Sequence, residues 1–130
     1  MKLKSLDTNV VLRLVLNDVP HQAAAAESFI EKYRCYITDL VIAETVFVLE
    51  KVYRMPRQTV IALVTKLLKL KTVIYNEVLV EATFELFGKA AQLSFVDCYS
   101  AVEARLYEND LVTFDKHLLK KGGSHVRELK

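Results

Sequence analysis

The chain has 130 residues, of which 52% are hydrophobic and 26% are charged; this balance is typical of one folded domain and excludes a disordered chain. Its formal net charge of +2 at pH 7 is too small to indicate a nucleic-acid partner by itself. No apolar run approaches the ~18 residues of a membrane span, and no leader pattern precedes Leu3, so we expect a cytoplasmic protein without a membrane partner.

Short strand patterns alternate with helical patterns along the chain, which is typical of an α/β domain. The predicted strands are residues 1–6, 34–37, 72–74, 111–113 and, at the edge of the sheet, 125–129. The predicted helices are residues 10–17, 18–33, 39–53, 56–68, 76–93, 95–108 and 116–119. Because no repeat or linker interrupts this order, we expect a single domain, residues 1–130, with a parallel sheet covered by helices on both faces.

The predicted helix over residues 39–53 carries the most informative side chain, Glu44. An apolar stripe at helical spacing is predicted to face the core; it consists of Leu40, Val41, Phe47 and Val48. Glu44 falls in the middle of that stripe, and burying an unpaired carboxylate is costly. The only cation on the helix, Lys51, is seven residues away. Glu44 is therefore protonated, paired with a distant Arg or Lys, or part of a pocket that holds a cation.

Three further acids follow predicted strands or begin predicted helices. Asp7 follows the first strand, Asp115 follows the fourth, and Asp97 lies near the start of the helix over 95–108. Because ligands bind at the carboxyl edge of a parallel sheet, we expect these acids to gather there with Glu44. At ~4 Å and an effective dielectric constant of ~20, each pair of like charges costs about 4 kcal/mol. A divalent cation relieves this repulsion, and all-oxygen ligands favour Mg²⁺ or Mn²⁺ over zinc.

Such a metal could activate water and neutralise charge on a phosphodiester, but most of these acids also have a purely structural explanation. Asp7 and Asp115 could each cap the helix that follows. Asp97, three residues after Ser94, could complete a capping box. Glu44 is the hardest of the acids to explain structurally, and the combination of all four is far more specific than any one.

Other residues give weaker signals. Thr8 and Asn9 could hold Asp7 or a metal-bound water, and Thr113 could bind a phosphate or a carboxylate, although all of these are also ordinary turn or strand residues. From Lys116 to the end, five Lys or Arg stand against one Glu, a balance of +4. The two cysteines lack the spacing of a metal site and are expected to be buried thiols, with a disulfide bridge left open as an alternative; they are Cys35 and Cys98.

Four segments of the chain resemble the PIN-domain nucleases, and within that family the VapC-type toxins of toxin–antitoxin pairs. In chain order the segments are LDTNVVLRLVLND with Asp7, ITDLVIAETVFVLEKVYRMPR with Glu44, FVDCYSAVEAR with Asp97, and LVTFDKHLLK with Thr113 and Asp115. They follow the family's order and span almost the whole chain. One departure is the turn over residues 108–110, which lacks the glycine expected there.

The resemblance implies a PIN-like three-layer α/β/α sandwich with a short, mainly parallel sheet, and an endoribonuclease that depends on Mg²⁺ or Mn²⁺. The family's acidic catalytic and metal-binding positions fall on Asp7, Glu44, Asp97 and Asp115. Thr113 falls on its polar accessory position, and Asn9 matches a common family residue. The resemblance also implies a homodimer and a small antitoxin partner that blocks the acidic site. The helices over 39–53 and 56–68 together predict a groove for that antitoxin, unless their stripes belong to the core.

Two other α/β functions require residues that this chain lacks. A phosphoacceptor receiver domain would carry paired acids after the first strand and a lysine after the last core strand, and this chain carries neither. The DTN sequence at residues 7–9 lacks the second aspartate of a DxD phosphatase. A PIN nuclease in RNA processing, and an inactive PIN fold kept for binding a partner, remain the alternatives to a toxin.

Overall fold

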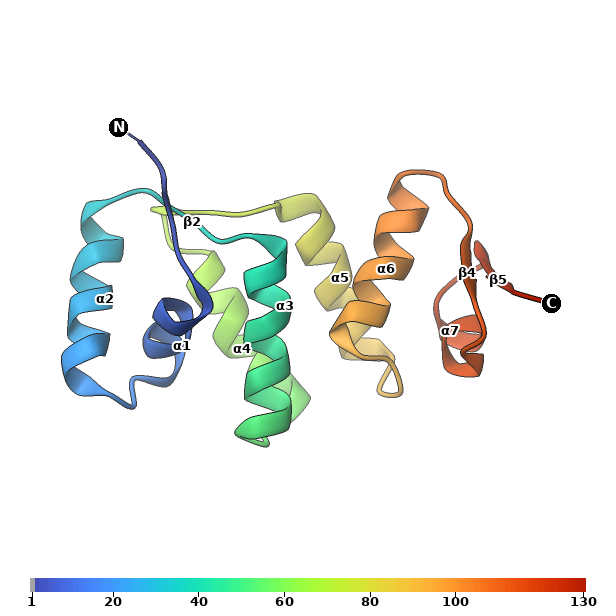
Figure 1. Cartoon of the computed structure of the whole chain (residues 1–130), viewed down its shortest axis with the longest axis horizontal. Helices are drawn as coiled ribbons and strands as arrows, with labels where there is room; N and C mark the ends of the chain where they lie inside the picture. The colour runs from blue at the N-terminus through green and yellow to red at the C-terminus, as the bar shows by residue number, and fades with distance from the viewer. Residues whose placement is uncertain (1) are drawn as a thin grey trace. The chain divides into compact units, whose positions relative to one another are not determined.

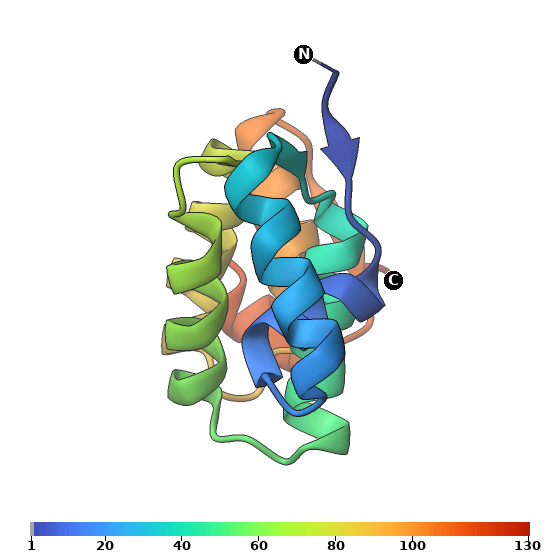
Figure 2. The same cartoon turned by 90° about the vertical axis from the view of Figure 1, so that its left-hand side faces the viewer.

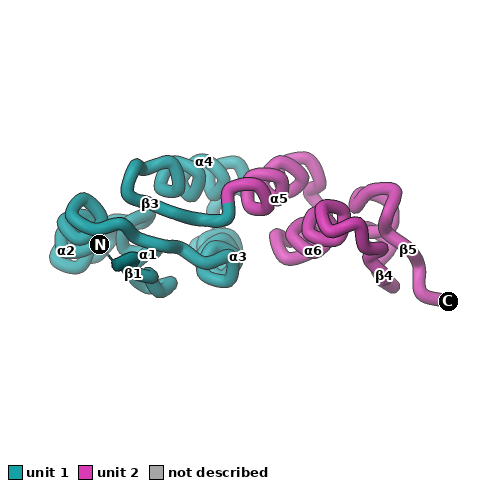
Figure 3. Tube along the Cα trace, turned by 90° about the horizontal axis from the view of Figure 1, so that it is seen from above, with its two compact units in different colours: residues 1–76 teal, residues 77–130 magenta. Residues whose placement is uncertain are grey.

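The computed structural model describes residues 2–130, and the chain divides into two compact units, Met1–Asn76 and Glu77–Lys130 (Figure 3). Unit 1 contains β1 (Lys4–Ser5), α1 (Thr8–Leu16), α2 (Pro20–Lys32), β2 (Cys35–Tyr36), α3 (Asp39–Phe47), η1 (Val48–Val52), α4 (Arg57–Leu68) and β3 (Val73–Ile74). Unit 2 contains α5 (Glu77–Lys89), α6 (Phe95–Leu106), β4 (Leu111–Thr113), α7 (Lys116–Lys121) and β5 (Val126–Glu128) (Figure 1). The predicted order of strands and helices is confirmed.

The strands are short and pair in parallel, as predicted for an α/β fold. In unit 1 the strand order is β1-β2-β3, with Cys35 of β2 opposite Lys4 of β1 and Val73 of β3. In unit 2, β4 pairs with β5, and α7 makes the crossover that a parallel pair requires. Within residues 2–130 the hydrogen bonds therefore define two sheets rather than the single sheet expected from the sequence.

The helix α1 is the centre of unit 1, because it packs against α2, α3 and α4 (Figure 2). Asp7 caps its first turn by accepting a hydrogen bond from the backbone N–H of Val10 at 3.1 Å. Asn17 ends the helix in the left-handed conformation, with φ of 52°, which asparagine tolerates better than most residues. The side chains of Val11 and Leu12 are buried against the neighbouring helices. The first helix is thus fixed at both ends by its own sequence.

The prediction that Leu40, Val41, Phe47 and Val48 face the core is wrong. Leu40 is 82% exposed and Phe47 is 60% exposed, and Glu44 is exposed between them. The buried face consists instead of Ile42, Thr45, Val46 and Leu49, which also have helical spacing. A helix that is apolar nearly all round does not reveal its core face by pattern alone. Burial of Thr45 is compensated because its hydroxyl donates to the carbonyl of Val41 at 2.7 Å.

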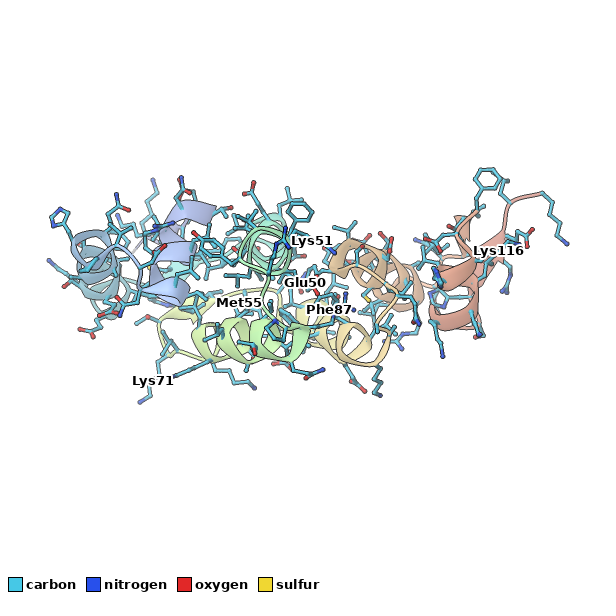
Figure 4. The ribbon with its side chains drawn as sticks, turned by 90° about the horizontal axis from the view of Figure 1, so that it is seen from below. Glu50, Lys51, Met55, Lys71, Phe87 and Lys116 are labelled. Carbon is cyan, nitrogen blue, oxygen red and sulfur yellow. The ribbon has the colours of Figure 1, made fainter. Side chains whose placement is uncertain are left out.

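This helix also changes its geometry part-way, since α3 passes into the π-helical segment η1 rather than continuing to residue 53. An ion pair joins η1 to α4: the Arg57 Nε lies 3.0 Å from Glu50 Oε2, and both side chains are largely buried. Figure 4 shows Glu50 on the side of η1 toward α4. The chain between them reverses at Arg54, whose φ is 55°. The ion pair therefore fixes the hairpin that connects the two helices.

The helix α4 supplies core rather than an open groove. Its buried side chains are Val60, Val64, Leu67 and Leu68. These positions make up most of the stripe that could have lined a groove for an antitoxin. Of the two alternatives left open for this stripe, the structure therefore shows the core one, because most of the stripe is already covered within the chain.

The core of unit 2 is aromatic. The rings of Phe84 and Phe87 on α5 pack against Phe95 at the start of α6, with centroid separations of 5.1 and 5.6 Å to Phe95. These separations and the tilted ring planes are those that aromatic pairs favour. The two helices pack closely along their lengths, and β4 follows at the end of α6.

Both cysteines are fully buried thiols, and neither forms a disulfide within residues 2–130. Burial raises the pKa of the Cys35 thiol, because the charged thiolate is disfavoured away from water. The Cys35 thiol donates to the carbonyl of Tyr33 at 3.4 Å. The expectation of buried thiols is confirmed. Within residues 2–130, no helix is both long and apolar enough to cross a bilayer.

The turn without glycine ends α6. The backbone N–H of Glu108 bonds the carbonyl of Arg105 at 3.1 Å, and that of Asn109 bonds the carbonyl of Ala104 at 2.7 Å. This is the hydrogen-bond pattern of a Schellman motif, whose left-handed position glycine normally occupies. Here Glu108 takes that position with φ of 59°. The turn that lacks glycine is therefore an ordinary one, in which Glu108 is strained by its positive φ.

We predict that Glu108→Gly stabilises the protein by about 0.5–1 kcal/mol, because it removes the cost of a side chain at positive φ. Chemical denaturation followed by circular dichroism measures the change. Glu108→Ala is the matched control, since it removes the carboxylate but keeps the Cβ, and its stability should stay near that of the wild type. A glycine variant that is less stable than the alanine variant would contradict this explanation.

Candidate acidic site

Asp7 and Glu44, the two acids predicted in the first half of the chain, line the same hollow in unit 1. Asp7 lies between β1 and α1, and Glu44 lies on α3, which packs against α1. The hollow has a volume of about 440 Å³ and is lined by Asp7, Thr8, Asn9, Leu12, Val41, Glu44 and Val48. The predicted accessory residues Thr8 and Asn9 therefore lie at the same hollow as the two acids.

The polar contacts at this hollow are few and specific. The hydroxyl of Thr8 donates a hydrogen bond to Oε1 of Glu44, across 36 positions of sequence. Asp7 uses Oδ1 to cap α1, and its Oδ2 makes no hydrogen bond within residues 2–130. The side-chain amide of Asn9 likewise has no partner among the described residues. The hollow therefore combines two carboxylates, a hydroxyl and an amide, with part of their bonding capacity unused.

The sequence predicted that the Glu44 carboxylate would be buried, but the side chain is exposed. Among the described residues no Arg or Lys forms an ion pair with it. Its side chain borders the hollow and accepts from Thr8. Glu44 therefore lines a pocket, whereas the premise of all three expected outcomes, burial of its carboxylate, was wrong. Whether that pocket holds a cation stays a prediction.

In unit 2, Asp97 completes a capping box at the start of α6. Its backbone N–H donates to Ser94 Oγ at 3.1 Å, and its Oδ2 accepts from the backbone N–H of Ser94 at 3.1 Å. The structural role predicted for this residue is confirmed. Its Oδ1 makes no hydrogen bond within the part of the chain that the structure describes, and the side chain is half-buried.

Asp115 caps α7 in a similar way. Its Oδ1 accepts from the backbone N–H groups of His117 at 2.7 Å and of Leu118 at 3.3 Å. Its own backbone N–H donates to the hydroxyl of Thr113 at 2.9 Å. Thr113 therefore helps to hold the turn that presents Asp115. The Oδ2 atom of Asp115 makes no hydrogen bond to residues 2–130.

Asp7, Asp97 and Asp115 thus share one arrangement. Each uses one carboxylate oxygen to bond a helix N-terminus and leaves the other without a partner in the described chain. A cap and a metal ligand are therefore compatible roles for the same side chain, because each role can use a different oxygen. The capping bond also fixes the orientation of the carboxylate, as hydrogen bonds to ligand carboxylates do in metal sites.

The structure adds a hollow that the sequence did not predict. It has a volume of about 620 Å³ and lies in unit 1 beside α1 and α2; its lining includes Asp7, Asn9, Arg13, Gln22 and Phe29. Arg13 pairs with Asp18 at 3.0 Å at its rim. Asp7 and Asn9 belong to the DTN sequence, but only the arrangement in space brings residues of α2 such as Gln22 and Phe29 beside them, so no signal in the sequence could have found the whole hollow.

Among residues 2–130, no three His, Cys, Asp or Glu side chains form a compact metal-binding group. The donor chemistry at the unit 1 hollow is nevertheless that of hard oxygen ligands: carboxylates from Asp7 and Glu44 and the hydroxyl of Thr8. Oxygen donors of this kind suit Mg²⁺ or Mn²⁺. The available residues are therefore of a type that fits such an ion.

Comparison with known families decides the family. The family model for the PIN domain matches residues 4–123. The chain belongs to the PIN domain family. PIN domains are generally nucleases that use divalent metal ions such as Mg²⁺ or Mn²⁺. Among curated proteins, no sequence matches this PIN domain.

We predict that the hydrogen bond between Thr8 and Glu44 couples α1 to α3. Thr8→Val and Glu44→Ala should each destabilise this PIN domain, and the double variant should lose less than the sum, with a coupling of about 0.5–1.5 kcal/mol. Urea denaturation of the four proteins measures the cycle. Thr8→Ser, which keeps the hydroxyl, is the control and should couple like the wild type. Additive losses would show that the bond contributes nothing to stability.

Proposed function

We propose that this PIN domain is an endoribonuclease, and that it is the toxin of a type II toxin–antitoxin pair. The proposed catalytic and metal-binding residues are Asp7, Glu44, Asp97 and Asp115. The observation that supports the proposal is that these carboxylates keep oxygens available to a ligand. The three aspartates each keep one oxygen without a partner in the described chain, and Glu44 shares a hollow with Asp7.

These carboxylates would hold Mg²⁺ or Mn²⁺, which, when bound, supplies an activated water and neutralises charge on the phosphate. The remaining work falls to the side chains themselves. Thr8 holds Glu44 in place through its hydroxyl, and Thr113 supports the backbone of Asp115. Asn9, whose amide is unused at the same hollow, is suited to hydrogen-bond a phosphate oxygen or a water molecule of the substrate complex.

The toxin role is supported by the four VapC-like segments rather than by the site alone. A small antitoxin and a second copy of the chain are the partners that this role requires. The helix α3, its continuation η1 and the residue that follows η1 carry exposed apolar side chains that suit a protein partner: Leu40, Phe47, Val52 and Tyr53. Large exposed apolar side chains are seldom grouped on a surface that stays in water. A cytoplasmic location fits an enzyme whose substrate is cellular RNA.

We predict that Asp7→Asn, Asp97→Asn and Asp115→Asn each lower RNA cleavage in Mg²⁺ by about 100-fold or more, because the ligand charge is lost. Asparagine still accepts the capping hydrogen bond, so the free energy of unfolding should change by less than about 0.5 kcal/mol. Glu44→Gln should behave in the same way. Cleavage of a labelled RNA and urea denaturation measure the two effects separately.

The controls for this series separate capping from catalysis. Glu31→Gln changes an exposed carboxylate within α2 that caps no helix, and it should cleave like the wild type. Asp7→Ala should lose both activity and about 1 kcal/mol of stability, since it also loses the cap. Cleavage should stop in EDTA and return with Mg²⁺. If the asparagine variants remain active, these residues act only as helix caps, and the proposal is overturned.

The toxin role has its own test. Induction of the wild-type chain in cells should arrest growth and produce defined cuts in total RNA, whereas Glu44→Gln should do neither. Co-expression of the small open reading frame next to the gene should restore growth, because its product would bind and block the site. RNA cleavage without growth arrest would favour a PIN nuclease in RNA processing. A stable protein that binds a partner but cleaves nothing would favour the inactive binding module.

A further inference from the structure

The second unit exposes an aromatic ring on the face of its small sheet. Phe114, directly after β4, is 75% exposed, and Val112, two residues earlier, is 54% exposed. Side chains two apart on an extended chain point to the same face. The neighbouring positions Leu111 and Thr113 are less exposed. The outward face of β4 therefore consists of Val112 and Phe114.

The paired strand β5 continues this face. The register places Arg127 beside Val112, and Arg127 is exposed. The backbone N–H of Leu129 donates to the carbonyl of Thr113 at 3.1 Å, so the pairing extends one residue past β5, and Leu129 is 49% exposed. We call this surface, made of Val112, Phe114, Arg127 and Leu129, the β4–β5 face.

Cations outnumber acids around the β4–β5 face, although Arg127 lies 3.8 Å from Asp110 and Asp115 is also exposed. From residue 116 onward the chain carries five Lys or Arg and one Glu, and these cations are all exposed. They lie on α7, on β5 and at the end of the chain: Lys116, Lys120, Lys121, Arg127 and Lys130. The α7 helix connects β4 to β5 (Figure 1). Cations therefore come after Phe114 in the sequence, on α7, and also lie on the paired strand β5.

We infer that the β4–β5 face binds a single-stranded segment of RNA, with Phe114 as the stacking platform for one base. An exposed aromatic ring on a sheet with cations around it is how proteins hold unpaired bases and their phosphates. A protein partner would suit Phe114 and Arg127, but it fits the neighbouring lysines of α7 less well, because lysine is depleted from protein interfaces. Lys, Arg and an aromatic ring instead complement a polyanion that carries flat bases.

This inference rests on the proposed nuclease and names the part of its substrate that unit 2 would hold. Phe114 directly precedes Asp115, and Lys116 directly follows it. Consecutive Cα atoms are about 3.8 Å apart, so a nucleotide stacked on Phe114 would keep its phosphate within reach of this carboxylate and this ammonium group. The face would therefore position the RNA next to a proposed catalytic residue and favour substrates that are unpaired there.

The test is RNA binding measured without cleavage. Fluorescence polarisation with a labelled single-stranded RNA of mixed sequence, in EDTA, gives the Kd of the full chain. We expect Phe114→Ala to weaken binding by about 5- to 100-fold, since stacking on one base contributes that much. Phe114→Tyr should bind like the wild type because it keeps the ring. Phe114→Leu should lose most of the affinity, because it keeps the apolar bulk without a flat ring.

A matched control is Tyr107→Ala, which removes an exposed aromatic ring from the loop before β4 rather than after it; its Kd should not change. Lys120→Gln with Lys121→Gln should reduce the slope of log K against log salt by up to about 1.4, since each contact with a single strand contributes about 0.7. Thermal melts confirm that each variant is folded. A Phe114→Ala variant that binds within twofold of the wild type, or a Tyr107→Ala variant that loses as much, overturns the inference.

The outcome also separates this inference from the proposed function. Loss of affinity in Phe114→Ala supports the RNA-binding face even if the wild type cleaves nothing in Mg²⁺. Cleavage that depends on the four acids, together with unchanged binding by Phe114→Ala, supports the nuclease and overturns the face. A variant with normal RNA affinity that no longer binds the antitoxin would show that the face belongs to a protein interface, which also overturns it.

Discussion

The proposed site depends on one constraint: each aspartate must stabilise a helix N-terminus with one carboxylate oxygen and keep the other for a metal ion. A helix N-terminus has unsatisfied N–H groups, and an aspartate at that point satisfies one or two of them with a single oxygen. Asp7, Asp97 and Asp115 all do so, and each retains a second oxygen that bonds no described residue. The folding requirement thus fixes the position and direction of a carboxylate, and the unused oxygen becomes available for chemistry.

This division explains why local sequence predicted so much of the candidate site. A cap and the N–H that it bonds are two or three residues apart, so the pattern around Asp115 or between Ser94 and Asp97 is enough to identify it. The alternation of short strands and helices is equally local, and it gave the α/β class and the order of the elements. Membership of the PIN family, matched over residues 4–123, agrees with that order.

Features that depend on distant residues could not be predicted in this way. The Thr8–Glu44 bond spans 36 positions, and no local pattern contains it. The face of α3 was predicted wrongly because Leu40 and Phe47 are as apolar as the buried Ile42 and Val46, so only packing against other helices decides which side is covered. The pairing of β4 with β5, in a sheet separate from the first three strands, could not be predicted either, because the sequence of a short strand does not specify its partner.

The most direct test of the central claim is whether each of the four proposed acids binds a metal ion. Addition of substoichiometric Mn²⁺ to a ¹³C-labelled chain broadens the NMR signals of carboxylates close to the bound ion. Asp7, Glu44, Asp97 and Asp115 should broaden together, before exposed acids such as Asp110. Broadening confined to Asp7 and Glu44, with Asp97 and Asp115 as sharp as Asp110, would show that the last two are helix caps and nothing more, and would contradict the metal-binding role proposed for them.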